Sequence, residues 1–511
     1  MNSARTLLRH LPQAYALLIA LLTAVGLWLF PIVGDDLNSI HCVRDAFLSV
    51  ESTQLRAADF SLVDLAEVWR NIIFIFTHDH FRLPNLLMPL VILLPRWVPA
   101  AISGAALYYI ITRGAAMAGS KFRGSSAVWM ALVMVVIFPW NDQLYLTSFQ
   151  APYLWDAALA LWLGRRLLLL RRPLPAPAMF FAGFVAAFGQ EAFGVALTGG
   201  AIVCAAFDSR LRTRANGAAV AGMALGIFAV LLPSLMCRHW FRWTFFSTRS
   251  MMWIPYAAFA LAYPLVLLLR RKRCTTPEMF MAVCAVLSAL LTAYFRTGAR
   301  VCCFGVIAAG IGFGSLIFRR SPRPYVHVLL LLTAILLPAH LAATATACMH
   351  AGADTRRAVA QYKAAPDALI FSDLTPRQKA PWYLLQKPYY DWMYHDKPAK
   401  LFAIVYGAPE HMPLRILPSA LRDFRWDEAT PIEGDAGLVA YKGLIVGPSP
   451  GTINLLLDFG KGPVATRMHI IDFIADGDTT TYRWYYPNQA TTAHILTPVP
   501  LRANNHFHYV P

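Results

Sequence analysis

The sequence predicts a mainly α-helical, polytopic membrane domain of about eleven spans over residues 1–348. An α+β domain outside the membrane is expected to follow over residues 349–511. Two observations lead to this fold class. Apolar residues make up 57% of the 511 residues and charged residues only 14%, whereas soluble proteins carry about 25% charged residues. The apolar residues also cluster in runs that approach or reach the ~20 residues needed by a spanning helix. Such runs occupy residues 13–33, 127–138, 217–236, 252–269 and 325–347.

Basic residues explain both the net charge of +17 and the expected orientation of the chain. They gather in short loops between the apolar runs, and the positive-inside rule places such loops in the cytoplasm. The charge therefore reports membrane topology, and a nucleic-acid partner is not expected. The basic loops lie at residues 113–123, 165–172, 210–214, 270–273 and 319–323.

The first apolar run resembles a signal peptide, because Arg5 and Arg9 precede it. It is long, however, and no Ala-x-Ala cleavage site closes it before Gly34. We therefore expect an uncleaved first span with a cytoplasmic N-terminus.

Residues 177–207 decide the topology of everything that follows. A single helix here would place the basic loops at 270–273 and 319–323 outside the cell. Two short spans that meet near Gln190 and Glu191 keep every basic loop inside, so the charge pattern favours two spans.

The remaining apolar runs complete the expected path of the chain. Residues 34–82 form a long outer loop, within which residues 62–76 have the apolar spacing of an interfacial helix. The C-terminal domain is then expected outside. The further spans are predicted at residues 99–111, 153–163, 277–295 and 301–318.

Beyond residue 349 the composition changes to alternating polar and apolar residues. Residues 451–474 read as strands around a Gly-Lys-Gly-Pro turn, and another strand is expected after the tight turn near residues 475–478. Residues 354–363 are predicted to be helical. This segment has the size of an ordinary domain.

An acidic pair, Asp35 and Asp36, directly follows the first span. Two adjacent carboxylates can orient an acceptor hydroxyl and take its proton, or hold a divalent cation. A solvated helix end is the plain alternative.

The outer loop ends in a polar segment that includes His78, His80 and Asn85. The two histidines flank Asp79, so a zinc site must be considered, but no third ligand is obvious. A polar cluster that lines a cavity is the favoured interpretation, and the presence of a metal stays open.

Several arginines are expected in outer loops, which are normally poor in arginine. Guanidinium groups bind phosphate in a bidentate manner, and these would lie at the depth of lipid headgroups. Interfacial snorkelling beside aromatic residues is an equally weighted alternative. The arginines concerned are Arg82, Arg238, Arg242, Arg296 and Arg300.

Glu191 lies between two short apolar runs, where an ionisable group is a candidate functional residue by default. Asp156, near the outer end of the span at 153–163, has similar standing. Each of them also fits a plain loop.

Three of these features together resemble the GT-C class of membrane glycosyltransferases. They are the acidic pair after the first span, the long first outer loop and the segment from His78 to Asn85 that closes this loop. They are also similar to a group of uncharacterised bacterial polytopic proteins. The resemblance covers the first half of the chain in detail, and the rest only in span number and the outer domain.

The resemblance implies a multi-pass protein of the bacterial inner membrane that takes part in building the cell envelope. Its donor would be a sugar on a polyprenyl phosphate, transferred at the outer face to a lipid, glycan or protein. Asp35 or Asp36 would be the catalytic base, and Arg82, Arg296 and Arg300 would hold the phosphate. No second acidic motif is visible, so a divalent cation stays open as a cofactor. The alternatives are a transporter or flippase for lipid-linked glycans and a non-catalytic assembly protein.

Overall fold

The structure is a computed structural model that describes residues 2–31, 36, 82–119, 123–140, 144–168, 174–236, 253–270, 274–295, 299–318 and 324–364, together with ten strands between residues 370 and 496. The chain divides into two compact units. The first comprises residues 1–29, 65–346 and 378–386, and the second comprises residues 30–64, 347–377 and 387–511. Each unit is described by itself.

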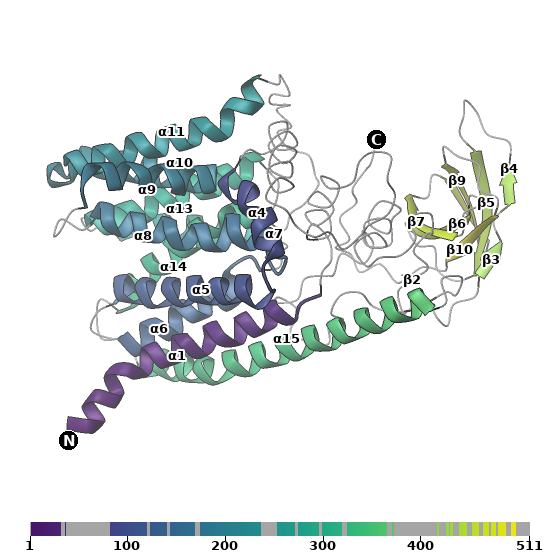
Figure 1. Cartoon of the computed structure of the whole chain (residues 1–511), viewed down its shortest axis with the longest axis horizontal. Helices are drawn as coiled ribbons and strands as arrows, with labels where there is room; N and C mark the ends of the chain where they lie inside the picture. Colours follow the sequence, from purple (N-terminus) through teal and green to yellow (C-terminus); the bar gives the residue numbers. More distant parts are fainter. Residues whose placement is uncertain are drawn as a thin grey trace. The chain divides into compact units, whose positions relative to one another are not determined.

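The first unit is a bundle of helices (Figure 1). Its α-helices are α1 (Asn2–Leu29), α4 (Leu83–Leu93), α5 (Trp97–Ala118), α6 (Arg123–Leu132), α7 (Thr147–Phe149), α8 (Asp156–Leu168), α9 (Ala176–Gly189), α10 (Glu191–Phe207), α11 (Arg214–Met236), α12 (Ile254–Leu269), α13 (Thr276–Phe295), α14 (Cys303–Phe318) and the start of α15 (Pro324–Ala364). Two π-helical segments, η1 (Val133–Ile137) and η2 (Gln150–Trp155), and two 3₁₀ turns, η3 (Ser209–Leu211) and η5 (Ala299–Cys302), complete the elements described.

Within the described residues, five helices are long and apolar enough to cross a membrane. They lie at His10–Leu29, Arg214–Leu232, Thr276–Tyr294, Ala299–Phe318 and Pro324–Ala358. Four shorter apolar helices accompany them at Gly124–Ile137, Ala176–Gly189, Glu191–Phe207 and Ile254–Leu269. Large apolar side chains such as Leu268, Leu331 and Ile335 are exposed on these helices. A mainly helical chain with such surfaces is what a bilayer selects, since a helix satisfies its own backbone hydrogen bonds.

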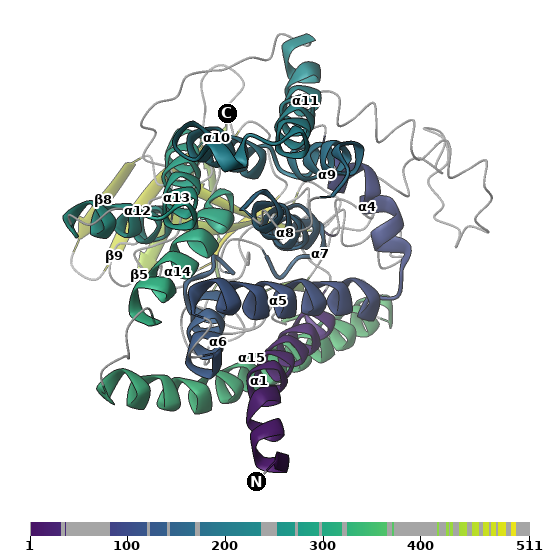
Figure 2. The same ribbon diagram turned by 90° about the vertical axis from the view of Figure 1, so that its left-hand side faces the viewer.

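The structure has two helices over residues 177–207, and the prediction that both of them cross the membrane stays a prediction. α9 ends at Gly189, Gln190 has an extended backbone, and α10 begins at Glu191. Gly194 of α10 packs against Ala187 of α9, so the chain folds back on itself at Gln190. In Figure 2, α9 lies beside α11, and α10 lies beside α13.

Small residues let α9 and α11 approach until their backbones touch. A Cβ on Gly222 would overlap the Phe180 carbonyl oxygen, and one on Gly226 would lie 2.6 Å from the Phe184 carbonyl oxygen. Such close approach is typical of helix pairs in membranes, where dispersion contacts replace the hydrophobic effect.

The basic helix ends gather at one end of the bundle, which we call the basic end. Asn216 at the start of α11 donates to the Leu167 carbonyl at the end of α8 (3.1 Å), and Thr276 at the start of α13 donates to Asp208 after α10 (3.0 Å). Ser125 of α6 meets His327 of α15 at 3.4 Å. The opposite end, which we call the Arg82 end, contains α4, η2, the break at Gln190 and η5.

Two elements at the Arg82 end are absent from the sequence prediction. α4 has only 11 residues, too few to span a bilayer, and it packs through Met88 and Val91 against Ala151 and Trp155. The latter two residues belong to η2, a π-helix that leads directly into α8. π-Helical segments occur frequently at functional sites.

The second unit contributes strands. They are β1 (Ile370–Phe371), β2 (Ile416–Leu417), β3 (Trp426–Glu428), β4 (Thr430–Ile432), β5 (Val439–Val446), β6 (Thr452–Asp458), β7 (Pro463–His469), β8 (Asp472–Asp476), β9 (Thr479–Tyr486) and β10 (Thr492–Leu496). Two antiparallel sheets have the orders β3-β10-β6-β7 and β4-β5-β9-β8, and β1 pairs with β2 in parallel. β6 and β7 pair on either side of the expected Gly-Lys-Gly-Pro turn.

The helix predicted at residues 354–363 is confirmed, and it forms the last part of α15, which runs unbroken to Ala364. Nothing in residues 348–364 stops the helix: the last proline before them is Pro338, and Gly352 is tolerated within it. The assignment of residues 349–511 to one α+β domain stays a prediction. The interfacial helix expected at residues 62–76 lies outside the described residues.

We predict that Gly222→Ala destabilises the bundle, because its Cβ would force α9 and α11 apart. Overpacking of this kind costs about 1–3 kcal/mol, measurable as a lower unfolding midpoint in detergent. Gly217→Ala on the same helix is the matched control, since a Cβ there meets nothing within 4 Å. Equal midpoints for the two variants would contradict the backbone contact.

Candidate functional site

An ion pair between Arg82 and Glu191 lies at the centre of the Arg82 end. Arg82 Nε donates to Glu191 Oε2 at 2.7 Å, and Nη2 donates to Oε1. Both side chains are only 12% exposed. The paired bonds are the bidentate geometry in which guanidinium and carboxylate bind most strongly. The pair joins residues that are 109 positions apart in the chain.

Local structure places both partners of this pair. Arg82 precedes α4, whose helix starts with Pro84 in its first turn. Glu191 is the first residue of α10, where the helix dipole stabilises a negative charge. The break at Gln190 therefore brings the carboxylate to a helix N-terminus at the end of the bundle.

Two further polar side chains are buried beside the break. Asp156 opens α8 and is 5% exposed, and Gln190 is fully buried. The Asp156 carboxylate packs directly on Gly189, where a Cβ would collide with it. Asp156 interacts electrostatically with both Glu191 and Arg82, so these residues form one cluster.

Parts of this cluster have no hydrogen-bond partner within the described structure. They are Oδ2 of Asp156 and both amide atoms of Gln190. An unsatisfied buried polar atom costs about 1–3 kcal/mol, and such atoms call for an explanation such as a water or a ligand. A polar group bound beside Gly189 would supply the missing bonds.

Arg300 brings a second guanidinium group to the cluster. It lies in the turn η5, and its Cζ is 4.3 Å from the ring centre of Phe149 and 5.6 Å from that of Tyr153. Arg300 interacts electrostatically with Arg82. The aromatic rings orient the guanidinium through cation–π contacts.

A hydrogen-bond network anchors η2, which supplies Tyr153. Ser103 of α5 donates to Gln150 Oε1 at 2.7 Å and accepts from Trp155 Nε1 at 2.6 Å. Gln150 in turn donates to the Tyr145 carbonyl at 3.2 Å. The segment between Phe149 and Asp156 is thereby held by α5.

Of the residues singled out in the sequence, the structure brings together Arg82, Glu191 and Arg300, with Asp156 beside them. Asn85 lies on the first turn of α4, where its backbone N–H donates to the Arg82 carbonyl. Asp36 is buried and belongs to the second unit. The other predicted site residues lie outside the described residues: Asp35, His78, His80, Arg238, Arg242 and Arg296.

Sequence reasoning missed the part played by Gln190, Phe149 and Tyr153. A glutamine between two apolar runs carries no signal beyond its position, and aromatic residues near a helix start are common. The only usable signal was the neighbourhood of Glu191 and Asp156.

In the part of the chain that the structure describes, no group of three or more His, Cys, Asp or Glu is arranged to hold a metal ion. The predicted pair His78 and His80 is not among these residues. The comparisons with known proteins found no matching family model, no matching curated protein and no matching solved structure.

We predict that Glu191→Gln lowers the free energy of unfolding by about 3–5 kcal/mol, because it leaves the Arg82 charge buried without its carboxylate. Unfolding in detergent measures this. Arg210→Gln is the control, since it breaks an ion pair whose arginine is 72% exposed, and it should leave the midpoint unchanged. A Glu191→Gln protein as stable as this control would show that the Arg82–Glu191 pair is not a structural contact.

Proposed function

We propose that this chain is a membrane glycosyltransferase that uses a sugar carried on a polyprenyl phosphate. One observation carries the proposal: two guanidinium groups, two carboxylates and an unsatisfied amide converge at the end of the bundle opposite the basic loops. The positive-inside rule makes the basic end cytoplasmic, so the cluster would face the outer leaflet. All eleven predicted spans would then cross the membrane, with the C-terminal segment outside.

The chemistry of the cluster suits an anion borne by a lipid. A polyprenyl donor is soluble only in the bilayer, so its binding site must lie at membrane level. Arg300 is oriented by two aromatic rings, and guanidinium groups bind phosphate oxygens strongly. Stabilising the departing phosphate is the largest contribution such a site can make to transfer.

The unsatisfied atoms beside Gly189 suit the sugar. Asp156 Oδ2 accepts hydrogen bonds, and the Gln190 amide both donates and accepts. Sugar hydroxyl groups present the complementary donors and acceptors. The catalytic base is proposed to be Asp36 or Asp35, and this role rests on the sequence resemblance.

A transporter for lipid-linked glycans is the second candidate, and it would place charges midway along its spans. Among the described residues of the helical bundle, the carboxylates of Asp156, Glu191 and Glu278 lie in the first turns of helices. Glu278 lies at the basic end and the other two at the Arg82 end, so none of the three provides a charged step midway along a helix, as a transport path would require.

We predict that Asp36→Asn lowers sugar transfer by about 100-fold or more, because removal of a general base costs 10²–10⁴ in rate. Membranes that contain the variant and a labelled polyprenyl-phosphate sugar provide the measurement, with protein amount checked in the same membranes. Asp354→Asn is the control, since that carboxylate is exposed on α15, and it should keep full activity.

The same assay tests the phosphate site. Arg300→Gln should weaken donor use by about tenfold or more, the loss expected from a charge-assisted hydrogen bond. Full activity of Asp36→Asn would show that Asp36 is not the catalytic base. Full activity of both variants would overturn the proposed function.

A further inference from the structure

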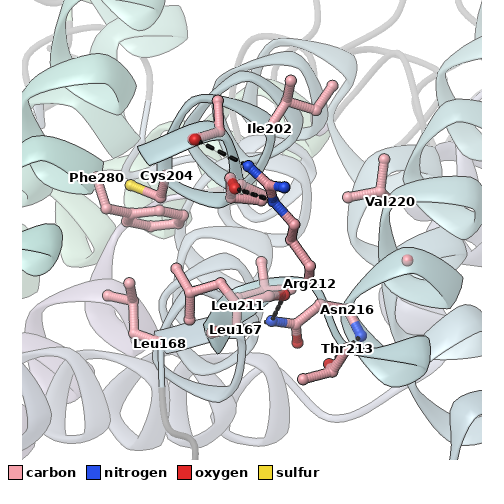
Figure 3. Close-up of a pocket in the computed structure, with 14 residues that line it drawn as sticks. Leu167, Leu168, Ile202, Cys204, Leu211, Arg212, Thr213, Asn216, Val220 and Phe280 are labelled. Carbon is pink, nitrogen blue, oxygen red and sulfur yellow. Dashed lines mark hydrogen bonds between the residues drawn. The ribbon is translucent and has the colours of Figure 1, made fainter. Parts of the chain in front are cut away.

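A cavity of about 520 Å³ lies at the basic end, between the end of α8, the end of α10 and the start of α11 (Figure 3). Its walls are mainly apolar, with Leu167, Ile202, Leu211, Val220 and Phe280 among them. Cavities that hold small molecules measure roughly 300–1,000 Å³, so this one is large enough for part of a lipid.

Exposed residues of α10 and α11 line the cavity. Ile202 lines it and is 54% exposed. Gly217, on the facing helix, also lines it, and a Cβ there would meet nothing within 4 Å. The side chain of Phe207, at the end of α10, is 79% exposed. An apolar opening flanked by exposed apolar residues on spanning helices is suited to lipid chains.

The polar side chains of the cavity are those of Arg212, Thr213 and Asn216. In Figure 3 the Arg212 side chain reaches across the cavity to the end of α10, where it donates to the carbonyls of Ala205 (2.8 Å) and Ala206 (3.0 Å). These bonds use two of its five N–H groups. The guanidinium is thereby fixed at the helix end with donors to spare.

The charge at this rim is positive. Arg210 is neutralised by Asp208, to which it donates two bonds of 2.9 Å. Those bonds hold the pKa of Asp208 at about 2, so the pair stays ionic at physiological pH. Arg212, which lines the cavity, carries a charge that no described carboxylate offsets through an ion pair.

We propose that this cavity binds an acidic phospholipid from the leaflet at the basic end. An acyl chain would occupy the apolar part, and the phosphodiester would bind Arg212. Basic pockets between spanning helices recognise anionic headgroups in this way. The site is independent of the proposed transferase site, because it lies at the other end of the bundle and shares no residue with it.

The test measures thermal unfolding of delipidated protein in detergent after addition of phosphatidylglycerol or phosphatidylcholine at equal mole fraction. Phosphatidylglycerol should raise the unfolding midpoint, because a ligand that binds only the folded state stabilises it, and phosphatidylcholine should not. Native mass spectrometry should show one retained phosphatidylglycerol. Soluble glycerol phosphate should give no shift, since it has no chain for the apolar walls.

Gly217→Leu should abolish the phosphatidylglycerol shift by placing a side chain in the cavity, where a Cβ meets nothing within 4 Å. Gly124→Leu is the matched control, because it too places a side chain in open space near a helix start, and it should keep the shift. Arg212→Gln should lower the apparent affinity about tenfold. Equal shifts with both lipids, a shift with glycerol phosphate alone, or an unchanged response of Gly217→Leu would overturn the proposal.

Discussion

The ion pair between Arg82 and Glu191 is the interaction on which the Arg82 end of the bundle depends. It ties the short helix α4 to the N-terminus of α10, where the chain breaks at Gln190. A break in a helix is costly in an apolar environment because it leaves backbone groups unpaired. Here Glu191, Gln190 and Asp156 meet at that break. The Asp156 carboxylate fits there because Gly189 has no Cβ. A charged pair that is 12% exposed is stable only while both partners are present.

The sequence was most informative where a global constraint applied. The basic loops required an even number of crossings over residues 177–207, and the structure has two helices there. Arg82, Glu191 and Arg300 were each conspicuous because charge is unfavourable near a membrane span. Their pairing was not predictable, since contacts between residues 109 apart leave no periodic pattern. α4 was missed because eleven apolar residues fit neither a span nor a loop, and the π-helix η2 has no sequence signature.

The two ends of the bundle present arginine in different ways. At the Arg82 end, one guanidinium is held by a carboxylate and the other lies against aromatic rings. At the basic end, Arg212 is held by the carbonyl groups that close α10. In both places neighbouring groups of the protein fix the orientation of the guanidinium group.

Sidedness is the claim that connects the cluster, the basic loops and the proposed chemistry, and cysteine labelling measures it most directly. In a protein with Cys42 and Cys237 replaced by serine, exposed Cys274 reports the basic end. A Leu94→Cys substitution, at an exposed position between α4 and α5, reports the Arg82 end. An impermeant maleimide should label Cys274 only after the membrane is permeabilised, and the cysteine at position 94 in intact cells. Labelling of both from the same side, or in the reverse order, would contradict the account.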